Sequence, residues 1–105
     1  MRVFRATGTG AIDETLSPDQ NFRVHAIKIH LNEAGGEGDL TVTTDASGGA
    51  VYDTVVVTQD MTSIIDKVFE IAYPFVKGDK LDFAWPNANA RTWGLEVLWT
   101  PEYVG

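Results

Sequence analysis

Residues 78–100 read GDKLDFAWPNANARTWGLEVLWT and carry the strongest structural signal in the chain. Large apolar side chains occupy every second position over residues 81–85 and again over residues 93–99. A period of two is typical of β-strands that bury one face. The segment between them, residues 86–92, begins with Pro86 and is rich in Asn, which indicates a turn. We therefore expect a hairpin that closes a β-domain.

Further strands are predicted from alternation and from β-branched residues elsewhere in the chain. They span residues 3–7, 22–31, 40–44, 51–58 and 67–73, whereas residues 13–19 are expected to form a loop. Apolar residues over residues 63–73 also show the spacing of a helix, but the β-rich neighbouring segments and Pro74 favour a strand there. The count is seven to eight short strands, with turn signals about every 8–12 residues, in one domain over residues 1–105. This pattern predicts an all-β, antiparallel β-sandwich or a small barrel.

The strand over residues 22–31 contains a break in its alternation. Phe22 and Val24 have the opposite parity to Ile27 and Ile29. A single extra residue in a strand restores the register, so we expect a β-bulge near Ala26.

The first strand is a candidate for pairing between subunits, because an edge strand invites pairing with another chain. Residues 1–7 are therefore the segment expected to cross to a neighbouring subunit.

Composition excludes several classes of partner. The chain has 105 residues and a formal net charge of −7, with eight basic residues that form no cluster. Binding to nucleic acid or to an anionic membrane needs clustered Lys and Arg, so neither is expected. No segment approaches the about 20 apolar residues of a membrane helix. The first residues lack the apolar run of a signal peptide, so we expect a protein that is made in the cytoplasm and used without export through the Sec pathway.

Catalytic and metal-binding patterns are weak. There is no Cys, and no Gly-x-Ser-x-Gly motif supports a nucleophile. Asp79 and Asp82 are the best acid pair for a small β-barrel enzyme, but Asp at strand ends and turns more often bends or caps the chain. His25 and His30 are too far apart along a strand to share a metal ion. We expect no catalytic residue, no metal and no cofactor, with an irregular calcium site between β-loops as the alternative.

Aromatic side chains supply the candidate interface or ligand platform, which comprises Trp85, Arg91, Trp93, Trp99 and Tyr103. Trp93 and Trp99 share their parity with Leu95 and Val97, which favours a position in the core or at a subunit interface. Trp85 precedes Pro86 at the mouth of a loop and is expected to be more open. Arg91, the cation of that loop, could pair with a carboxylate of a partner.

Exposed Trp and Tyr rings stack on sugars as well as on proteins, so a carbohydrate-binding module is an alternative hypothesis. In that hypothesis Trp85, Trp93 and Tyr103 form the platform, and Asp82 and Asn87 bind sugar hydroxyls. A receptor-binding tip of a phage would use the same surface.

The order of motifs resembles that of small virion proteins of tailed bacteriophages, along most of the chain. The motifs are DETLSPD at 13–19, FRVHAIKIHLN at 22–32, LTVTTD at 40–45, the Gly48-Gly49 turn, Tyr52-Asp53, TQDM at 58–61, KGD at 77–79, and residues 87–97. The resemblance implies a jelly-roll-like β-sandwich that associates with a capsid or tail, commonly as a trimer. It implies no cofactor and no catalytic residue.

These observations together predict a non-enzymatic structural protein of a tailed-phage virion. We expect a capsid decoration, cement or head-spike subunit that associates with itself, as a trimer, and with the major capsid protein or neighbouring virion proteins. A net charge far from zero suits a subunit that must stay dispersed before it docks. A position on the tail or baseplate is the nearest variant.

Overall fold

The computed structural model describes residues 1–102, which form eight β-strands and one short 3₁₀ helix. The elements are β1 Arg2–Gly8, β2 Ile12–Leu16, β3 Phe22–Leu31, β4 Asp39–Asp45, η1 Ala50–Tyr52, β5 Thr54–Asp60, β6 Asp66–Phe75, β7 Lys80–Trp85 and β8 Trp93–Pro101. Within these residues no helix is long and apolar enough to cross a membrane.

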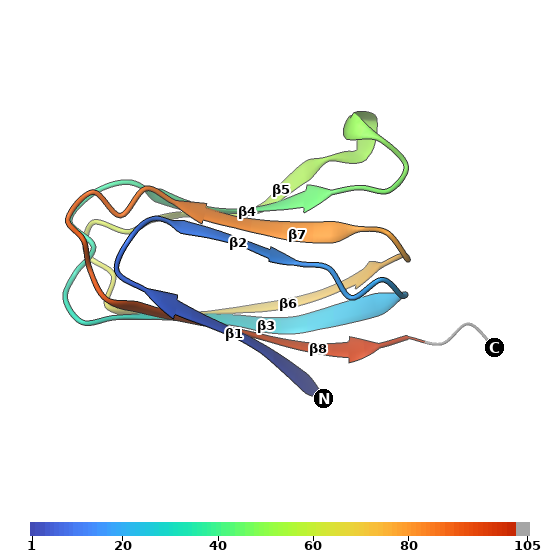
Figure 1. Cartoon of the computed structure of the whole chain (residues 1–105), viewed down its shortest axis with the longest axis horizontal. Coiled ribbons are helices and arrows are strands. Elements are labelled where there is room, and N and C mark those ends of the chain that lie inside the picture. The colour runs from blue at the N-terminus through green and yellow to red at the C-terminus, as the bar shows by residue number, and fades with distance from the viewer. Residues whose placement is uncertain (103–105) are drawn as a thin grey trace.

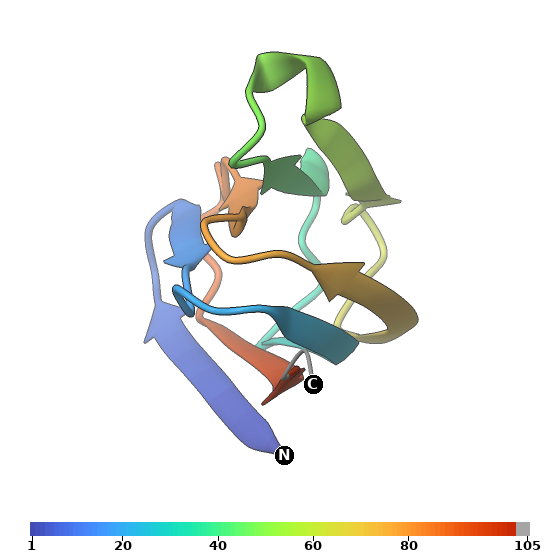
Figure 2. The same ribbon diagram turned by 90° about the vertical axis from the view of Figure 1, so that its right-hand side faces the viewer.

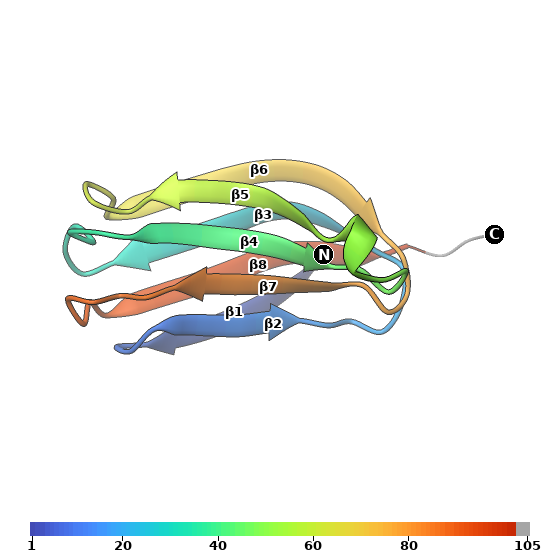
Figure 3. The same cartoon turned by 90° about the horizontal axis from the view of Figure 1, so that it is seen from above.

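The strands form two antiparallel sheets of four, in the orders β1-β8-β3-β6 and β2-β7-β4-β5. The sheets face one another (Figure 1), and seen from above β5 overlies β6 at one side while β2 overlies β1 at the other (Figure 3). β1 pairs with β8, β2 with β7, β3 with β6 and β4 with β5, so each pair is enclosed in the sequence by the one before it. This nesting of eight strands in two sheets is the jelly-roll arrangement. The predicted all-β, jelly-roll-like antiparallel β-sandwich is therefore confirmed.

The core lies between the sheets and is built by the alternation seen in the sequence. Every second residue of β7 and β8 is buried, as are those of β3 on each side of its irregularity. Phe22 stacks on Phe75 with ring centroids 4.9 Å apart, and Trp99 meets the edge of Phe22 at 6.1 Å. Burying one such large side chain contributes about 1.5–3 kcal/mol, so the inner faces of the strands supply most of the driving force.

The predicted bulge in the strand over residues 22–31 is confirmed. The pairing of β3 with both of its neighbours shifts register between Val24 and Ala26. As a result Phe22, Val24, Ile27 and Ile29 are all at most 2% exposed and face the same core. The predicted strand over residues 67–73 is confirmed as well, and it extends over the whole of β6.

The expected hairpin of residues 78–100 is wrong. β7 and β8 are both strands, but they belong to different sheets and do not pair with each other. Alternation shows which face of a strand is buried and does not identify its partner. Residues 86–92 are long enough to cross the about 10 Å between packed sheets as well as to reverse the chain.

Two further expectations are corrected. Residues 13–19 were expected to be a loop, but β2 covers Ile12 to Leu16. The strand expected over residues 51–58 starts at Thr54, because Ala50–Tyr52 form η1. In the single chain, β1 pairs with β8 along its full length, and the crossing of residues 1–7 to a neighbouring subunit stays a prediction.

Candidate functional site

The three tryptophans lie in the core. Trp85 is 1% exposed, Trp93 is 3% and Trp99 is 8%. The indole nitrogens of the first two are satisfied internally, since Trp85 donates to the carbonyl of Glu37 and Trp93 to that of Gly10. The expectation that Trp85 stands open at the loop mouth is therefore wrong, and these rings do not form an exposed platform. Tyr103 lies outside the described residues.

Arg91 and Asn87 hold loops of the chain together. The guanidinium of Arg91 donates to the carbonyl of Ala34 and lies 3.1 Å from a carboxylate oxygen of Glu33. The carboxylate expected from a partner is thus supplied by the chain itself. Asn87 is 5% exposed, and its amide faces the carbonyls of Thr9 and Gly10, so it is not presented to a sugar. Both residues stabilise the loop end of the sandwich.

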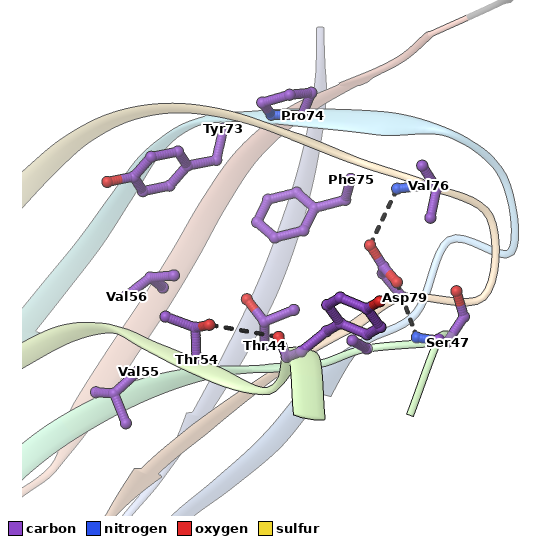
Figure 4. Close-up of a pocket in the computed structure, with 13 residues that line it drawn as sticks. Thr44, Ser47, Thr54, Val55, Val56, Tyr73, Pro74, Phe75, Val76 and Asp79 are labelled. Carbon is purple, nitrogen blue, oxygen red and sulfur yellow. Dashed lines mark hydrogen bonds between the residues drawn. The ribbon is translucent and has the colours of Figure 1, made fainter. Parts of the chain in front are cut away.

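An apolar groove lies at the opposite end, and sequence reasoning did not find it. It opens between the β4–β5 connection and the β6–β7 turn and has a volume of about 620 Å³. Its apolar walls are formed by Tyr52, Val55, Val56, Tyr73, Phe75 and Val76. Figure 4 shows Tyr73 and Phe75 on one side, facing the β5 residues on the other. The volume falls within the about 300–1,000 Å³ of ligand pockets.

Large apolar side chains are exposed around this groove. Among the described residues, Val51 is 87% exposed, Tyr52 66%, Val76 58%, Val55 54% and Tyr73 49%. They come from η1, β5, β6 and the following turn, which are separate in the sequence. Four of them line the groove, and Val51 precedes Tyr52 in η1. Single exposed apolar residues are ordinary, but several gathered at a groove mark an interaction site. This cluster and the groove together are the candidate functional site.

The polar groups of the groove are few. Asp79 is the one charged residue among the described residues that line it, and its carboxylate accepts hydrogen bonds from the backbone N–H groups of Ser47 and Val76. These bonds tie the β4–β5 connection to the β6–β7 turn (Figure 4). Thr44 lies 8% exposed in the groove wall, and Thr54 donates to the carbonyl of Tyr52. The groove therefore presents a nearly neutral apolar surface on a chain of net charge −7.

Two other carboxylates, those of Asp82 and Asp60, form hydrogen bonds within the local structure. Asp82 accepts a hydrogen bond from Thr15 across the sheet, and Asp79 is held in its turn as described. Asp60 accepts from the hydroxyl and the N–H of Thr62, and these two bonds lower the pKa of its carboxyl. Among residues 1–102, no group of three or more His, Asp or Glu side chains is placed to hold a metal ion.

A scan of the chain against models of known protein families finds no match, and a search of curated proteins finds none either. The resemblance to tailed-phage virion proteins stays a prediction, and function must be argued from the groove.

The sequence contained one signal for this site. Residues 46–52 read ASGGAVY and carry no charge, in a chain in which 22% of residues are charged. The two glycines mark this segment as a turn, and Val51 and Tyr52 follow them. Those two residues were assigned to a strand, so their exposure at the tip of a connection was not foreseen.

Proposed function

We propose that the protein is a non-enzymatic structural component of a tailed-phage virion that acts by association with other protein subunits. A capsid decoration, cement or head-spike subunit fits best, and its partners are further copies of the chain and the major capsid protein. The trimer implied by the resemblance is one such assembly. The chain would catalyse no reaction and would act by burying a surface that is complementary to the surfaces of its partner subunits.

The observation that carries this proposal is the cluster of exposed apolar side chains around the groove. Aromatic residues are enriched and charged residues are depleted at the centres of protein interfaces. Tyr52 and Tyr73 supply the aromatic part, Val51, Val55 and Val76 the aliphatic part, and Asp79 is already hydrogen-bonded. The jelly-roll arrangement gives further support, because viral capsid domains use it, although lectin domains do so too.

The experiment that tests the proposal locates the chain on particles. Virions produced by the genome that encodes the chain are purified and labelled with gold-bound antibodies raised against it. Antibody that has been pre-adsorbed with the purified chain is the control. We expect label over the heads at many copies per particle. Virions in which mass spectrometry detects no copy of the chain would contradict the proposal, and label confined to the tail would overturn the head assignment.

Glycan binding in the groove is a second candidate, which two exposed tyrosines favour. Tyr52 and Tyr73 lie on the groove, and hydroxyl groups of Thr44 and Ser47 and the carboxylate of Asp79 are within its lining. Aromatic rings stack on the apolar faces of sugars, and carboxylates accept hydrogen bonds from sugar hydroxyls. This site differs from the tryptophan platform expected from the sequence, because the tryptophans are buried.

A further inference from the structure

An apolar protrusion stands beside the groove. η1 projects beyond the strands at one corner of the sandwich, as Figures 1 and 2 show. None of its three residues is buried, and the side chain of Val51 extends almost fully into solvent. Exposing a valine at the apex of a connection gives the isolated chain no packing energy. Within residues 1–102 nothing buries this side chain, so a contact with another molecule is needed for it to contribute packing energy.

The protrusion is held in one shape by internal hydrogen bonds. The N–H of Tyr52 donates to the carbonyl of Gly49, and that of Asp53 to the carbonyl of Ala50. The carboxylate of Asp53 in turn accepts from the N–H of Ala46, which closes the base of the loop. A preformed loop loses little conformational freedom on binding, which favours association.

We propose that Val51, at the apex of η1 in one copy of the chain, occupies the apolar groove of a second copy, while Tyr52 stays in the wall of its own groove. This inference rests on the proposed function and names the contact through which the subunits associate. Each copy carries both a protrusion and a groove, at the same end of the sandwich, so every copy can give and receive. Reciprocal insertion produces a two-fold dimer, and insertion in one direction produces a ring such as a trimer when the rotation between neighbouring copies closes.

Charge supports a second copy as the occupant. Two chains of net charge −7 repel one another, and they approach best where each presents few charges. Residues 46–52 are uncharged, and the carboxylate of Asp79 in the groove is engaged by two N–H groups. A cationic peptide would find no free cluster of carboxylates among the described residues of the groove.

A second copy also explains both features, whereas a small ligand explains one. A sugar or other small molecule in the groove would cover Tyr73 and Val56 but would leave Val51 exposed at the apex of η1. Insertion of η1 from another copy covers the groove and buries the protrusion at the same time. The exposed aliphatic rim, Val55 and Val76, would then pack against the incoming segment.

The test compares Val51→Asp with Val68→Asp as a matched control. Val68 is 53% exposed on β6, against 87% for Val51, and does not line the groove, so the same charge is added at an exposed valine away from the proposed contact. Light scattering gives the mass of each protein over a range of concentrations, and thermal melts confirm that both variants fold. We expect the native chain and Val68→Asp to form the same closed oligomer of the 11.5 kDa chain. For Val51→Asp the dissociation constant should rise about tenfold to hundredfold.

Two results would overturn the inference. One is a native chain that stays monomeric at every concentration, and the other is an oligomer that Val51→Asp leaves unchanged. The first result would favour glycan binding if the tyrosine fluorescence of the monomer responds to a sugar and that of its Tyr73→Ala variant does not. Gold label on virions together with a monomer in solution would leave the proposed function standing without this contact. An oligomer that is absent from virions would support the contact and reject the function.

Discussion

At the scale of single residues, Asn87 shows how one buried amide can order two loops. Its Nδ2 lies within hydrogen-bond distance of the carbonyls of Thr9, Gly10 and Arg91, and its Oδ1 accepts from the N–H of Arg91. The residue has a φ of 51°, a left-handed conformation that Asn adopts more readily than most residues. The sequence marked Asn87 as a turn residue but could not show that its side chain is buried.

Replacing Asn87 with Ala should lower the free energy of unfolding by about 1–3 kcal/mol, because buried carbonyls lose their donor. The control is Asn89→Ala, in the same loop, where the side chain is exposed and makes a single hydrogen bond to Gly35. Urea denaturation measures both variants. Equal losses of stability in the two variants would show that the buried network of Asn87 has no special role.

The tryptophans mark the limit of prediction for single residues. Parity placed Trp93 and Trp99 with Leu95 and Val97, and all four are buried. Trp85 shares the parity of Leu81 and Phe83, yet the neighbouring proline suggested an open position. Burial of Trp85 depends on the loop over residues 32–38, which covers it and accepts its N–H at Glu37. A contact between segments 48 residues apart leaves no local trace in the sequence.

At the scale of elements, the strands could be predicted and their partners could not. Seven of the eight strands overlap a predicted one, because alternation and β-branched runs are local. β2 was missed since its central inward position holds Glu14, opposite Phe83, rather than an apolar residue. A charged residue turned inward on an edge strand discourages pairing with other chains, and it also hides the strand from a search for alternating apolar residues.

The loop over residues 32–38 provides a prediction at this scale. Gly35 lies against Met61, and a Cβ there would be 2.4 Å from the carbonyl oxygen of Met61 and 3.0 Å from the ring of Trp85. Gly35→Ala should therefore cost about 1–3 kcal/mol through overpacking. Gly10→Ala is the control, because no atom lies within 4 Å of the added Cβ. If thermal melts show the same midpoint for both variants, the close packing of this loop against Trp85 is refuted.

At the scale of the whole molecule, the chain combines a closed core with one open apolar end. The jelly-roll buries the inner faces of both sheets, and no part of residues 1–102 covers the protrusion of η1 or the groove. Fold class followed from local pattern, but the groove arises where β5 and β6, on opposite sheets, come together with two connections. No local sequence pattern indicates that these strands and connections come together, so the tryptophans were predicted as the candidate site instead.

Salt provides a prediction for the whole molecule. Screening of the net charge of −7 should strengthen association, because an apolar contact gains nothing from charge and the chains repel each other. The screening length falls from about 10 Å at 0.1 M salt to about 3 Å at 1 M. Sedimentation across this range should show the dissociation constant decreasing. An increase would indicate a contact made by opposite charges.

The most direct measurement is a crosslink between two copies. The chain has no Cys, so tagged Val51→Cys and untagged Val76→Cys chains can be mixed and oxidised without competing thiols. If η1 of one copy occupies the groove of another, the mixed disulfide should form in excess over a mixture in which Val68→Cys replaces Val76→Cys. Equal yields in the two mixtures would contradict the assembly of this protein through its apolar groove.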